Sequence, residues 1–173
     1  MVENFNKIIS DKSFEEVGSL AVIQRKNFSN EVICSHNLLG LTFAHLTFLD
    51  CNFIDINFMR TYFISCDFKN CNFTETIFFK SELDNCNFKN CKIFQSDLLR
   101  VNFMENIFTD CQFEIVDMAG AVFTCCELIQ PKFEKVRFLE SVTLSKSKIW
   151  KSKKCIEVNT FDNVSKIVDN LKD

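Results

Sequence analysis

A large apolar residue recurs at every fifth position over most of this chain. Read in fives from Cys51, the sequence runs CNFID, INFMR, TYFIS, CDFKN, CNFTE, TIFFK, SELDN, CNFKN, CKIFQ, SDLLR, VNFME, NIFTD and CQFEI. The third residue of each group is large and apolar, the first is mostly small, and the second is most often Asn or Asp. Helices and strands have periods of 3.6 and 2 residues. Because five is a quarter of twenty, the pattern predicts a square coil with one group on each side.

This five-residue frame begins near Ile23 and continues without insertion to Phe138. It slips by one residue after Phe138, and Leu144 and Ile149 restart it. Four groups per coil give about six coils, in which residues twenty apart stack on each other. The stacked sets should include the following two ladders: Phe28, Phe48, Phe68, Phe88 and Phe108, and Cys51, Cys71, Cys91 and Cys111.

The composition decides how the corners of such a coil are made and what the cysteines do. Only 3 of the 173 residues are Gly, so Asn, Asp, Lys and Ser must form the frequent turns. The chain has 10 Cys, and most stand in the first place of a group, where Ser, Thr, Val and Ala replace them. That substitution pattern is typical of small, buried, reduced side chains. The first residues do not resemble a signal peptide and no apolar run is long enough to span a membrane, so we expect a cytoplasmic protein.

The segments outside the repeat are predicted to cover its two ends, because a solenoid exposes its core at each end. At the N-terminus, Phe5, Ile8 and Ile9 indicate a short helix. Ser13 with Glu16 has the form of a capping box, which predicts a helix start there.

Two features lie beyond the last group. Residues 150–155 (WKSKKC) are basic and are interpreted as an edge segment. Residues 161–171 place apolar side chains on one helical face, and this helix would either cover the end of the core or pair with a second copy of the chain. The candidate dimerisation residues are Phe161, Val164, Ile167, Val168 and Leu171.

The residues that enzymes and metal sites need are sparse. The two histidines, His36 and His45, belong to the early groups, and with three Gly there is no Gly-rich phosphate loop. The Cys-x4-Cys spacings in CDFKNC and CNFKNC suggest a metal site, but the five-residue repeat alone produces that spacing. We therefore predict no catalytic residues, no cofactor and no metal.

One side of the predicted coil is apolar on its outside as well as its inside. The fourth place should face outward, and on the side centred on Phe58 and Phe78 it forms an apolar stripe of Leu39, Met59, Phe79, Leu99, Ala119 and Leu139. The fifth place beside this stripe carries Arg60, Lys80 and Arg100. A contiguous outer apolar patch is typical of an interface. The alternative is that a terminal segment folds back over the stripe.

Charge is distributed unevenly along the column. Residues 27–131 contain 13 Asp or Glu and 6 Lys or Arg, a balance of −7, whereas residues 132–154 contain 8 basic and 2 acidic residues, a balance of +6. The acidic residues do not form one long ladder. Asp50 and Asp110 share a predicted stack, but Asn70 and Asn90 lie between them.

Groups such as CNFTE, CNFKN, CDFKN and SDLLR resemble the pentapeptide repeat family over roughly residues 21–149. The resemblance implies an all-β solenoid, a right-handed quadrilateral β-helix, here of about six coils with short terminal helices. Some members of that family bind DNA gyrase or other topoisomerases by mimicking DNA, and several of those dimerise through their C-terminal ends. This chain departs from the family pattern in using Phe and Cys more often than Leu and Ala.

The sequence therefore predicts three parts: an N-terminal cap (1–20), the repeat (21–149) and a basic segment with a capping or dimerisation helix (150–173). The predicted function is a non-catalytic scaffold for protein–protein interaction, with Leu39, Met59, Phe79, Leu99, Leu139, Arg60, Lys80 and Arg100 as the candidate interface. The alternative is a DNA mimic that binds gyrase. The predicted partners are an unidentified protein, a second copy or a topoisomerase, with no direct binding to nucleic acid or membrane.

Overall fold

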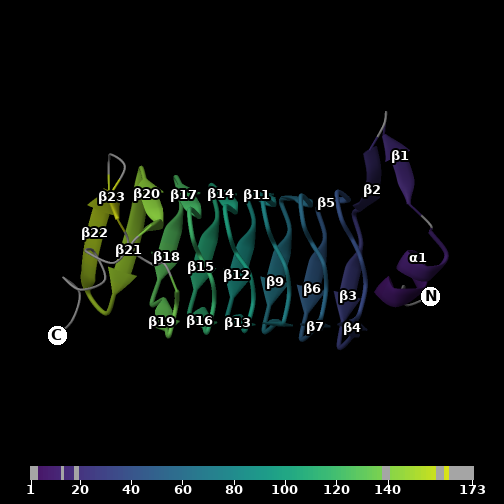
Figure 1. Ribbon diagram of the computed structural model, residues 1–173, viewed down its shortest axis with the longest axis horizontal. Coiled ribbons are helices and arrows are strands. Elements are labelled where there is room, and N and C mark those ends of the chain that lie inside the picture. The colour runs from purple at the N-terminus through teal and green to yellow at the C-terminus, as the bar shows by residue number, and fades with distance from the viewer. Residues whose placement is uncertain (1–3, 13, 18–19, 138–140, 159–161, 164–173) are drawn as a thin grey trace.

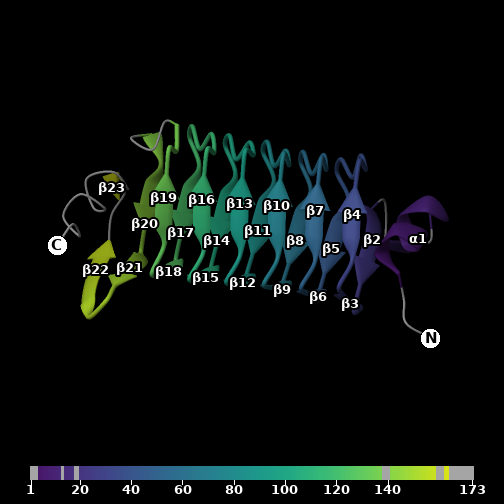
Figure 2. The ribbon, with the colours of Figure 1, turned by 90° about the horizontal axis from the view of Figure 1, so that it is seen from below.

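The computed structural model describes residues 4–12, 14–17, 20–137, 141–158 and 162–163. The molecule is a rod in which square coils stack along one axis, with a short helix at one end and a β-hairpin at the other (Figure 1). A view from below shows the same column and the same two ends (Figure 2). The predicted all-β solenoid of about six coils is confirmed.

Three sides of the column are sheets of short, mostly parallel strands, here called faces A, B and C. Face A consists of β1 (Glu15–Val17), β2 (Leu20–Gln24), β5 (Thr42–Ala44), β8 (Tyr62–Ile64), β11 (Glu82–Asp84), β14 (Asn102–Met104), β17 (Val122–Thr124), β20 (Thr143–Ser145) and β23 (Asp162–Asn163). Face B consists of β3 (Asn27–Ser29), β6 (Thr47–Leu49), β9 (Asp67–Lys69), β12 (Asn87–Lys89), β15 (Ile107–Thr109), β18 (Glu127–Ile129), β21 (Ser147–Lys151) and β22 (Lys154–Val158). Face C consists of β4 (Val32–Cys34), β7 (Asn52–Ile54), β10 (Asn72–Thr74), β13 (Lys92–Phe94), β16 (Gln112–Glu114) and β19 (Lys132–Glu134).

The fourth side, face D, has single β-bridges in place of strands. The bridges join Asn37, Asn57, Ile77, Asp97, Asp117 and Arg137 in succession. All four sides therefore stack with the predicted step of twenty residues, as when Phe53 pairs with Phe73 on face C. Beyond β17 the step is twenty-one, since Phe123 pairs with Leu144, so the predicted slip of the frame is confirmed.

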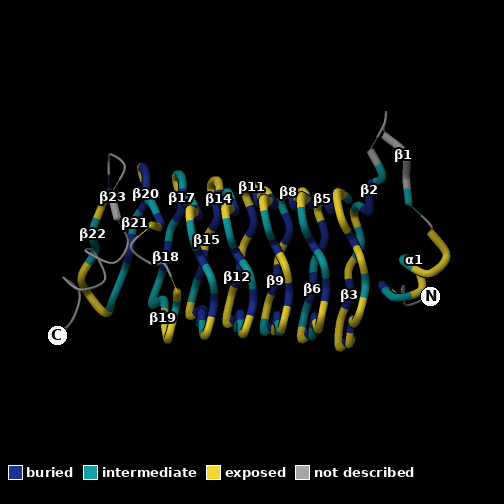
Figure 3. Tube along the Cα trace, in the orientation of Figure 1, coloured by how far each residue is buried: buried dark blue, intermediate teal, exposed yellow. Residues whose placement is uncertain are grey.

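The third-place side chains fill the inside of the column. Most of them are almost fully buried, and the tube in Figure 3 alternates between buried strand centres and exposed corners. The predicted ladder on face B is present: Phe68 and Phe88 stack with ring centroids 4.8 Å apart, and Phe88 and Phe108 repeat that distance. Offset stacking of this kind adds to the free energy gained from burying the rings.

The first place is small because its side chain reaches back to the preceding coil. The Cys71 thiol donates to the carbonyl oxygen of Phe48 at 3.4 Å, and Thr61 Oγ1 donates to the carbonyl of Leu38 at 2.9 Å. The same bond to the residue 23 positions earlier recurs at Cys86 and Asn106. All 10 cysteines are free thiols, so the predicted reduced, packed role of the first-place cysteines agrees with the structure.

The fifth place turns every corner with a positive φ. From Arg25 to Lys135 the non-glycine residues at this place have φ between 49° and 58°. Asn, Asp, Ser and Lys make many of these corners, as predicted, and Arg, Gln and Glu also occur. This left-handed region normally disfavours residues that have a Cβ atom. Pairing with the coils above and below holds each corner in place, as when Asn70 N–H donates to Lys89 at 2.9 Å.

The N-terminal end of the core is covered by the helix α1 (Phe5–Ser10), which begins after the N-cap Asn4. The Phe5 ring is fully buried against Phe28 at 5.2 Å. Its backbone N–H donates to the buried Glu31 carboxylate at 2.9 Å, and the His36 ring bonds Asn6 at 2.9 Å. Glu31 and His36 occupy first places of the first coil, where no earlier coil offers a carbonyl, so they hold the helix instead.

The capping-box prediction was wrong. Residues Glu15–Val17 form the strand β1, which pairs antiparallel with β2, so no helix begins at Glu16. Ser13 lies outside the described residues. Pairing with the free edge of β2 outweighs the local helix signal in this short segment.

At the other end, β21 and β22 form an antiparallel hairpin, and the basic segment 150–155 is its turn and flanking residues. Strand β21 continues through residue 150, which is the first residue of the predicted C-terminal part (150–173). Asp162–Asn163 form β23, paired antiparallel with β20, so these two residues are not helical. The candidate dimerisation residues Phe161, Val164, Ile167, Val168 and Leu171 lie outside the described residues.

Candidate functional site

Face D differs from the other sides in its backbone. Each coil makes a tight turn here, closed by a hydrogen bond from residue i+3 to residue i, such as Thr61 N–H to the carbonyl of Phe58 at 3.0 Å. Arg60, at the third position of that turn, has φ 54°, which is the geometry of a type II turn. Face D is therefore a column of turns, and its fourth-place and fifth-place residues lie at the turn tips.

A second hydrogen bond fixes most of these turns. The second-place side chain accepts the N–H of the fourth-place residue: Asn57 Oδ1 accepts from Met59 at 3.0 Å, and Asp97 Oδ1 accepts from Leu99 at 2.7 Å. Asp117 and Ala119 repeat the bond at 3.1 Å. Asn and Asp are favoured at such places because their short side chains can accept from the backbone two residues later.

The predicted stripe is in register along face D. The N–H of Arg60 donates to the carbonyl of Phe79 at 3.0 Å, and the N–H of Lys80 donates to that of Leu99 at 3.1 Å. Successive fourth-place side chains therefore stack and half-bury one another. The Leu39 side chain, at the N-terminal end of the stripe, is 47% exposed. Leu139 lies outside the described residues, so the structure gives it no position.

The predicted cations lie in one row at the edge of the stripe, at the corner between faces D and A. The Lys80 ammonium lies over the Phe79 ring, 5.1 Å from its centroid. The stem of Arg100 passes Gly120, where a Cβ atom would lie 3.5 Å from its Cγ. Arg60, Lys80 and Arg100 form no ion pair with any residue that the structure describes. The row is therefore an uncompensated positive ladder beside an apolar stripe.

The alternative that a terminal segment folds back over the stripe is not observed for the described N-terminal residues. The helix α1 lies over the first coil at the end of the column, well away from the middle of face D (Figure 1). The described C-terminal strands extend faces A and B at the opposite end (Figures 1 and 2).

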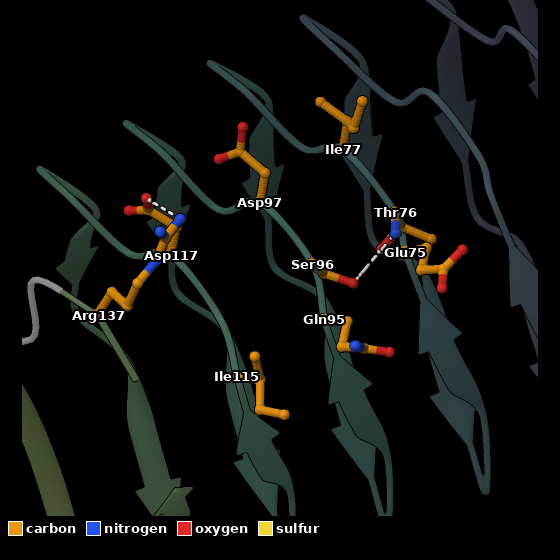
Figure 4. A pocket seen from close by; sticks show the side chains of 9 residues that line it. All are labelled: Glu75, Thr76, Ile77, Gln95, Ser96, Asp97, Ile115, Asp117 and Arg137. Atoms are coloured by element: carbon orange, nitrogen blue, oxygen red, sulfur yellow. Dashed lines mark hydrogen bonds and ion pairs between the residues drawn. The ribbon is translucent and has the colours of Figure 1, made fainter. Parts of the chain in front are cut away.

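The other edge of face D is hollowed into a groove that the sequence analysis missed. The C/D groove, as we call it, has a volume of about 420 Å³ and lies along the corner between faces C and D. Figure 4 shows its two rows of side chains, with Asp97 and Ile77 on one side and Glu75, Gln95 and Ile115 on the other. Thr76 and Ser96 share a hydrogen bond of 2.9 Å on its floor, and Asp117 pairs with Arg137 at 2.9 Å near one end. The signal for this groove was present in the sequence as two isoleucines, Ile77 and Ile115, at places where polar residues are usual.

The corner between faces B and C is lined differently. The Asn70 amide donates to Asp50 at 2.8 Å, and the Asn90 amide donates to Asn70 at 3.0 Å. A smaller groove of about 310 Å³ follows this amide ladder. The Asp50 charge thus receives an amide donor from the neighbouring coil, which makes the corner a poor copy of a row of phosphates.

The buried thiols have no metal-binding geometry. In the part of the chain that the structure describes, no three His, Cys, Asp or Glu side chains are grouped as metal ligands. The adjoining Cys111 thiol, together with burial, raises the pKa of Cys91 to about 12, and burial raises that of Cys126 to about 12. Both thiols are therefore protonated at neutral pH and act as hydrogen-bond donors to backbone carbonyls.

This geometry, with one group of five residues per side and a turn at every fifth residue, defines a quadrilateral β-solenoid. Residues 41–78 match the model of a family described as pentapeptide repeats, in eight copies. The resemblance to the pentapeptide repeat family is thereby confirmed, and the structure is that of a repeat scaffold.

The chain also aligns weakly with solved structures. Full-length QnrB1, described as a plasmid-mediated fluoroquinolone resistance protein, aligns with 14% identity and a TM-score of 0.37 over 85% of this chain and 100% of its own. HetL, described as involved in heterocyst differentiation regulation in the cyanobacterium Nostoc sp. strain PCC 7120, aligns with 10% identity and a TM-score of 0.31 over 73% of each chain. Likenesses this weak carry no argument about function. No curated protein sequence matches the chain.

Among the described residues, no helix combines the length and the apolar character that a membrane crossing needs.

Proposed function

We propose that this protein is a non-catalytic, cytoplasmic scaffold that binds another protein through face D. The observation that carries the proposal is the stacking of Met59, Phe79 and Leu99 beside an uncompensated row of cations. Repeat scaffolds commonly use one long face for binding, because each coil adds the same contact. The free thiols of the first places fit a reducing compartment.

The row of cations indicates the chemistry of the partner. Arg60, Lys80 and Arg100 occupy the same corner of successive coils, about 4.8 Å apart along the column. Like charges at this spacing repel, and side chains near the surface still feel that repulsion through water. An acidic group beside an apolar patch on the partner would relieve the repulsion and cover the stripe. The expected partner surface is therefore apolar with an acidic edge.

The variant Phe79→Glu tests this proposal. It places a carboxylate in the middle of the stripe and should abolish partner capture. Phe94→Glu is the matched control, because Phe94 is also a half-buried fourth-place residue with a lysine, Lys92, over its ring at 4.8 Å, but it lies on face C. If Phe79→Glu leaves the oligomeric state, the captured proteins and the thermal stability unchanged, the proposal is wrong.

A second candidate function is the DNA-mimic role, in which the acidic body of the rod occupies the DNA-binding surface of gyrase. The balance of −7 over residues 27–131 favours it. Against it, the acidic residues are spread over several faces, and amides interrupt the stack that contains Asp50 and Asp110. A gyrase supercoiling assay that detects neither inhibition nor protection at micromolar protein would exclude this role.

Homodimerisation through residues 161–171 stays a prediction. If these residues pair with a second copy instead of covering the end of the core, the intact chain should elute as a dimer in a sizing experiment, and a chain that ends after Trp150 should elute as a monomer. If the intact and the shortened chain elute in the same oligomeric state, residues 161–171 do not form a dimer.

A further inference from the structure

Two isoleucines break the local rules of the repeat, and both line the C/D groove (Figure 4). Ile77 occupies the second place on face D, where Asn57, Asp97 and Asp117 each accept the N–H of the residue two positions later. Isoleucine has no acceptor, so the N–H of Phe79 has no hydrogen-bond partner among the described residues. By the geometry of the neighbouring coils, this N–H points toward the place that the Ile77 side chain occupies, so isoleucine leaves a local donor unsatisfied.

Ile115 breaks a different rule. It turns a corner with φ 55°. Of the described residues with a positive φ, it is the one whose side chain is β-branched. A branched Cβ is strongly disfavoured in this region. Ile115 is also 39% exposed and Ile77 is 38% exposed, so neither gains a fully buried position in exchange. Residues that oppose their local structure without compensation are expected at functional sites.

The rest of the groove is acidic. Glu75 lies on the face C side and Asp97 on the face D side, and neither forms an ion pair with a described residue. Asp117 is neutralised by Arg137. The groove therefore offers two apolar contacts and two carboxylates without an ion pair among the described residues, within about 420 Å³, in the size range of small ligand sites.

The order of these groups along the groove matches an extended peptide. From one end to the other, the walls present Glu75 and Ile77 in one coil, Asp97 in the next, and Ile115 in the third. Two coil steps span about 10 Å, and four extended residues also span about 10 Å. Alternate residues of an extended chain point to opposite sides. In a segment of the pattern basic–aliphatic–aliphatic–basic, the first and third side chains would therefore face Glu75 and Ile115 on one wall, and the second and fourth would face Ile77 and Asp97 on the other.

We propose that the C/D groove binds an extended segment of a partner protein with this pattern. The aliphatic side chains contact Ile77 and Ile115, and the basic ones pair with Glu75 and Asp97. This site goes beyond the face D stripe, because it involves the opposite edge of that face and the opposite charge. Either site can exist without the other.

The test is a titration of the full chain with the peptide acetyl-Lys-Ile-Ile-Lys-amide, followed by NMR of the isoleucine methyl groups. We expect saturable shifts at Ile77 and Ile115, and none with acetyl-Glu-Ile-Ile-Glu-amide. Asp97→Asn keeps the acceptor for Leu99 but removes the charge, and should weaken binding about tenfold. Asp84→Asn, an exposed aspartate on face A, makes the same charge change away from the groove and should have no effect.

The isoleucine variants give the sharper readout. Ile77→Asn and Ile115→Asn should each weaken binding at least tenfold, while raising the unfolding temperature by about 2–4 °C because they restore the local rule. If the two isoleucines served only the packing of the fold, their replacement would lower peptide affinity and unfolding temperature together. The proposal is overturned if the basic peptide produces no saturable shifts, if Asp84→Asn weakens binding as much as Asp97→Asn, or if the isoleucine variants bind as tightly as the native chain.

Discussion

Two corners of the same column follow different rules. At the corner between faces B and C, the fifth place forms the ladder Asp50, Asn70 and Asn90, in which the amides bond one another from coil to coil. At the corner between faces C and D, the same place holds Ile115. This residue has no side-chain amide, and its φ of 55° is unfavourable for a β-branched side chain. The first corner satisfies the repeat, and the second departs from it.

In a repeat protein, a corner that departs from its regular neighbours indicates where a functional site can lie. Every coil must satisfy the same backbone requirements, so the regular corner shows what the fold needs for stability. A departure that exposes apolar area and is expected to lower stability, such as Ile77 or Ile115, is then visible against its own neighbours.

Moving the irregular feature into the regular corner should have the largest effect. Asn90→Ile places a β-branched residue at φ 53° and removes the amide bond to Asn70. The two losses together should lower the free energy of unfolding by about 2–3 kcal/mol. Urea unfolding measures this, and Asn90→Gly, which loses the amide without the strain, should cost less. Equal losses for the two variants would contradict the strain argument.

The thiol ladder should make the regular corner sensitive to alkaline pH. Cys91 has a pKa of about 12 in the folded chain and about 9.0 when unfolded, so the unfolded state releases its proton first as the pH rises. The stabilisation is complete below about pH 9 and is lost progressively as the pH rises through 12. At pH 10 the loss from this thiol is about 1.4 kcal/mol.

The measurement is urea unfolding at pH 7 and pH 10, with Cys91→Ser as the matched variant. Serine does not titrate in this range, so its variant should lose about 1.4 kcal/mol less between the two pH values. The hydroxyls Thr76 and Ser96 occupy first places beside the C/D groove and should contribute no such pH dependence. An equal pH effect in the native chain and in Cys91→Ser would contradict the assignment.

Correcting the irregular corner should stabilise the protein. Ile115→Asn replaces a β-branched residue at φ 55° by one that tolerates the left-handed region, and should raise the free energy of unfolding by about 1 kcal/mol. Ile115→Val keeps the branched Cβ and should leave stability nearly unchanged. A destabilised Ile115→Asn would mean that the Ile115 side chain supports the fold.

The smallest expected gain comes from Ile77→Asn. The new side chain would accept the N–H of Phe79, as Asn57 accepts that of Met59 at 3.0 Å. We expect a gain of about 0.5–1 kcal/mol from this hydrogen bond. Ile77→Thr, a β-branched residue whose hydroxyl competes less well for this bond, should gain less. Slower amide hydrogen exchange at Phe79 in the asparagine variant would confirm the cause.

Much of this architecture could be predicted from the sequence, because one residue in five carries the information. The third-place residues specify the core, and the slip after Phe138 appears in the structure as the changed step between Phe123 and Leu144. The strand Glu15–Val17 could not be predicted, since its three residues form a strand only by pairing with β2. The roles of Glu31 and His36 follow from a large polar residue in a small-residue place, but only once the first coil is known to have no neighbour.

The candidate sites were predicted in part. The stripe at Met59, Phe79 and Leu99 follows from the twenty-residue step, whereas its half-buried state depends on how closely the turns stack. To predict the C/D groove, one must know that the fifth place has a positive φ and that the second-place side chain on face D accepts a hydrogen bond within a turn. Without those two facts, Ile77 and Ile115 are merely two more apolar residues in an apolar sequence.

Ile77 and Ile115 are expected to reduce the stability of the fold in exchange for a contact in the C/D groove. Urea unfolding of the double variant Ile77→Asn/Ile115→Asn tests it most directly. The two sites are two coil steps apart, about 10 Å, and share no bond, so their gains should add to about 1.5–2 kcal/mol. A double variant less stable than the native chain would show that the isoleucines belong to the packing of the rod, and the claim would fail.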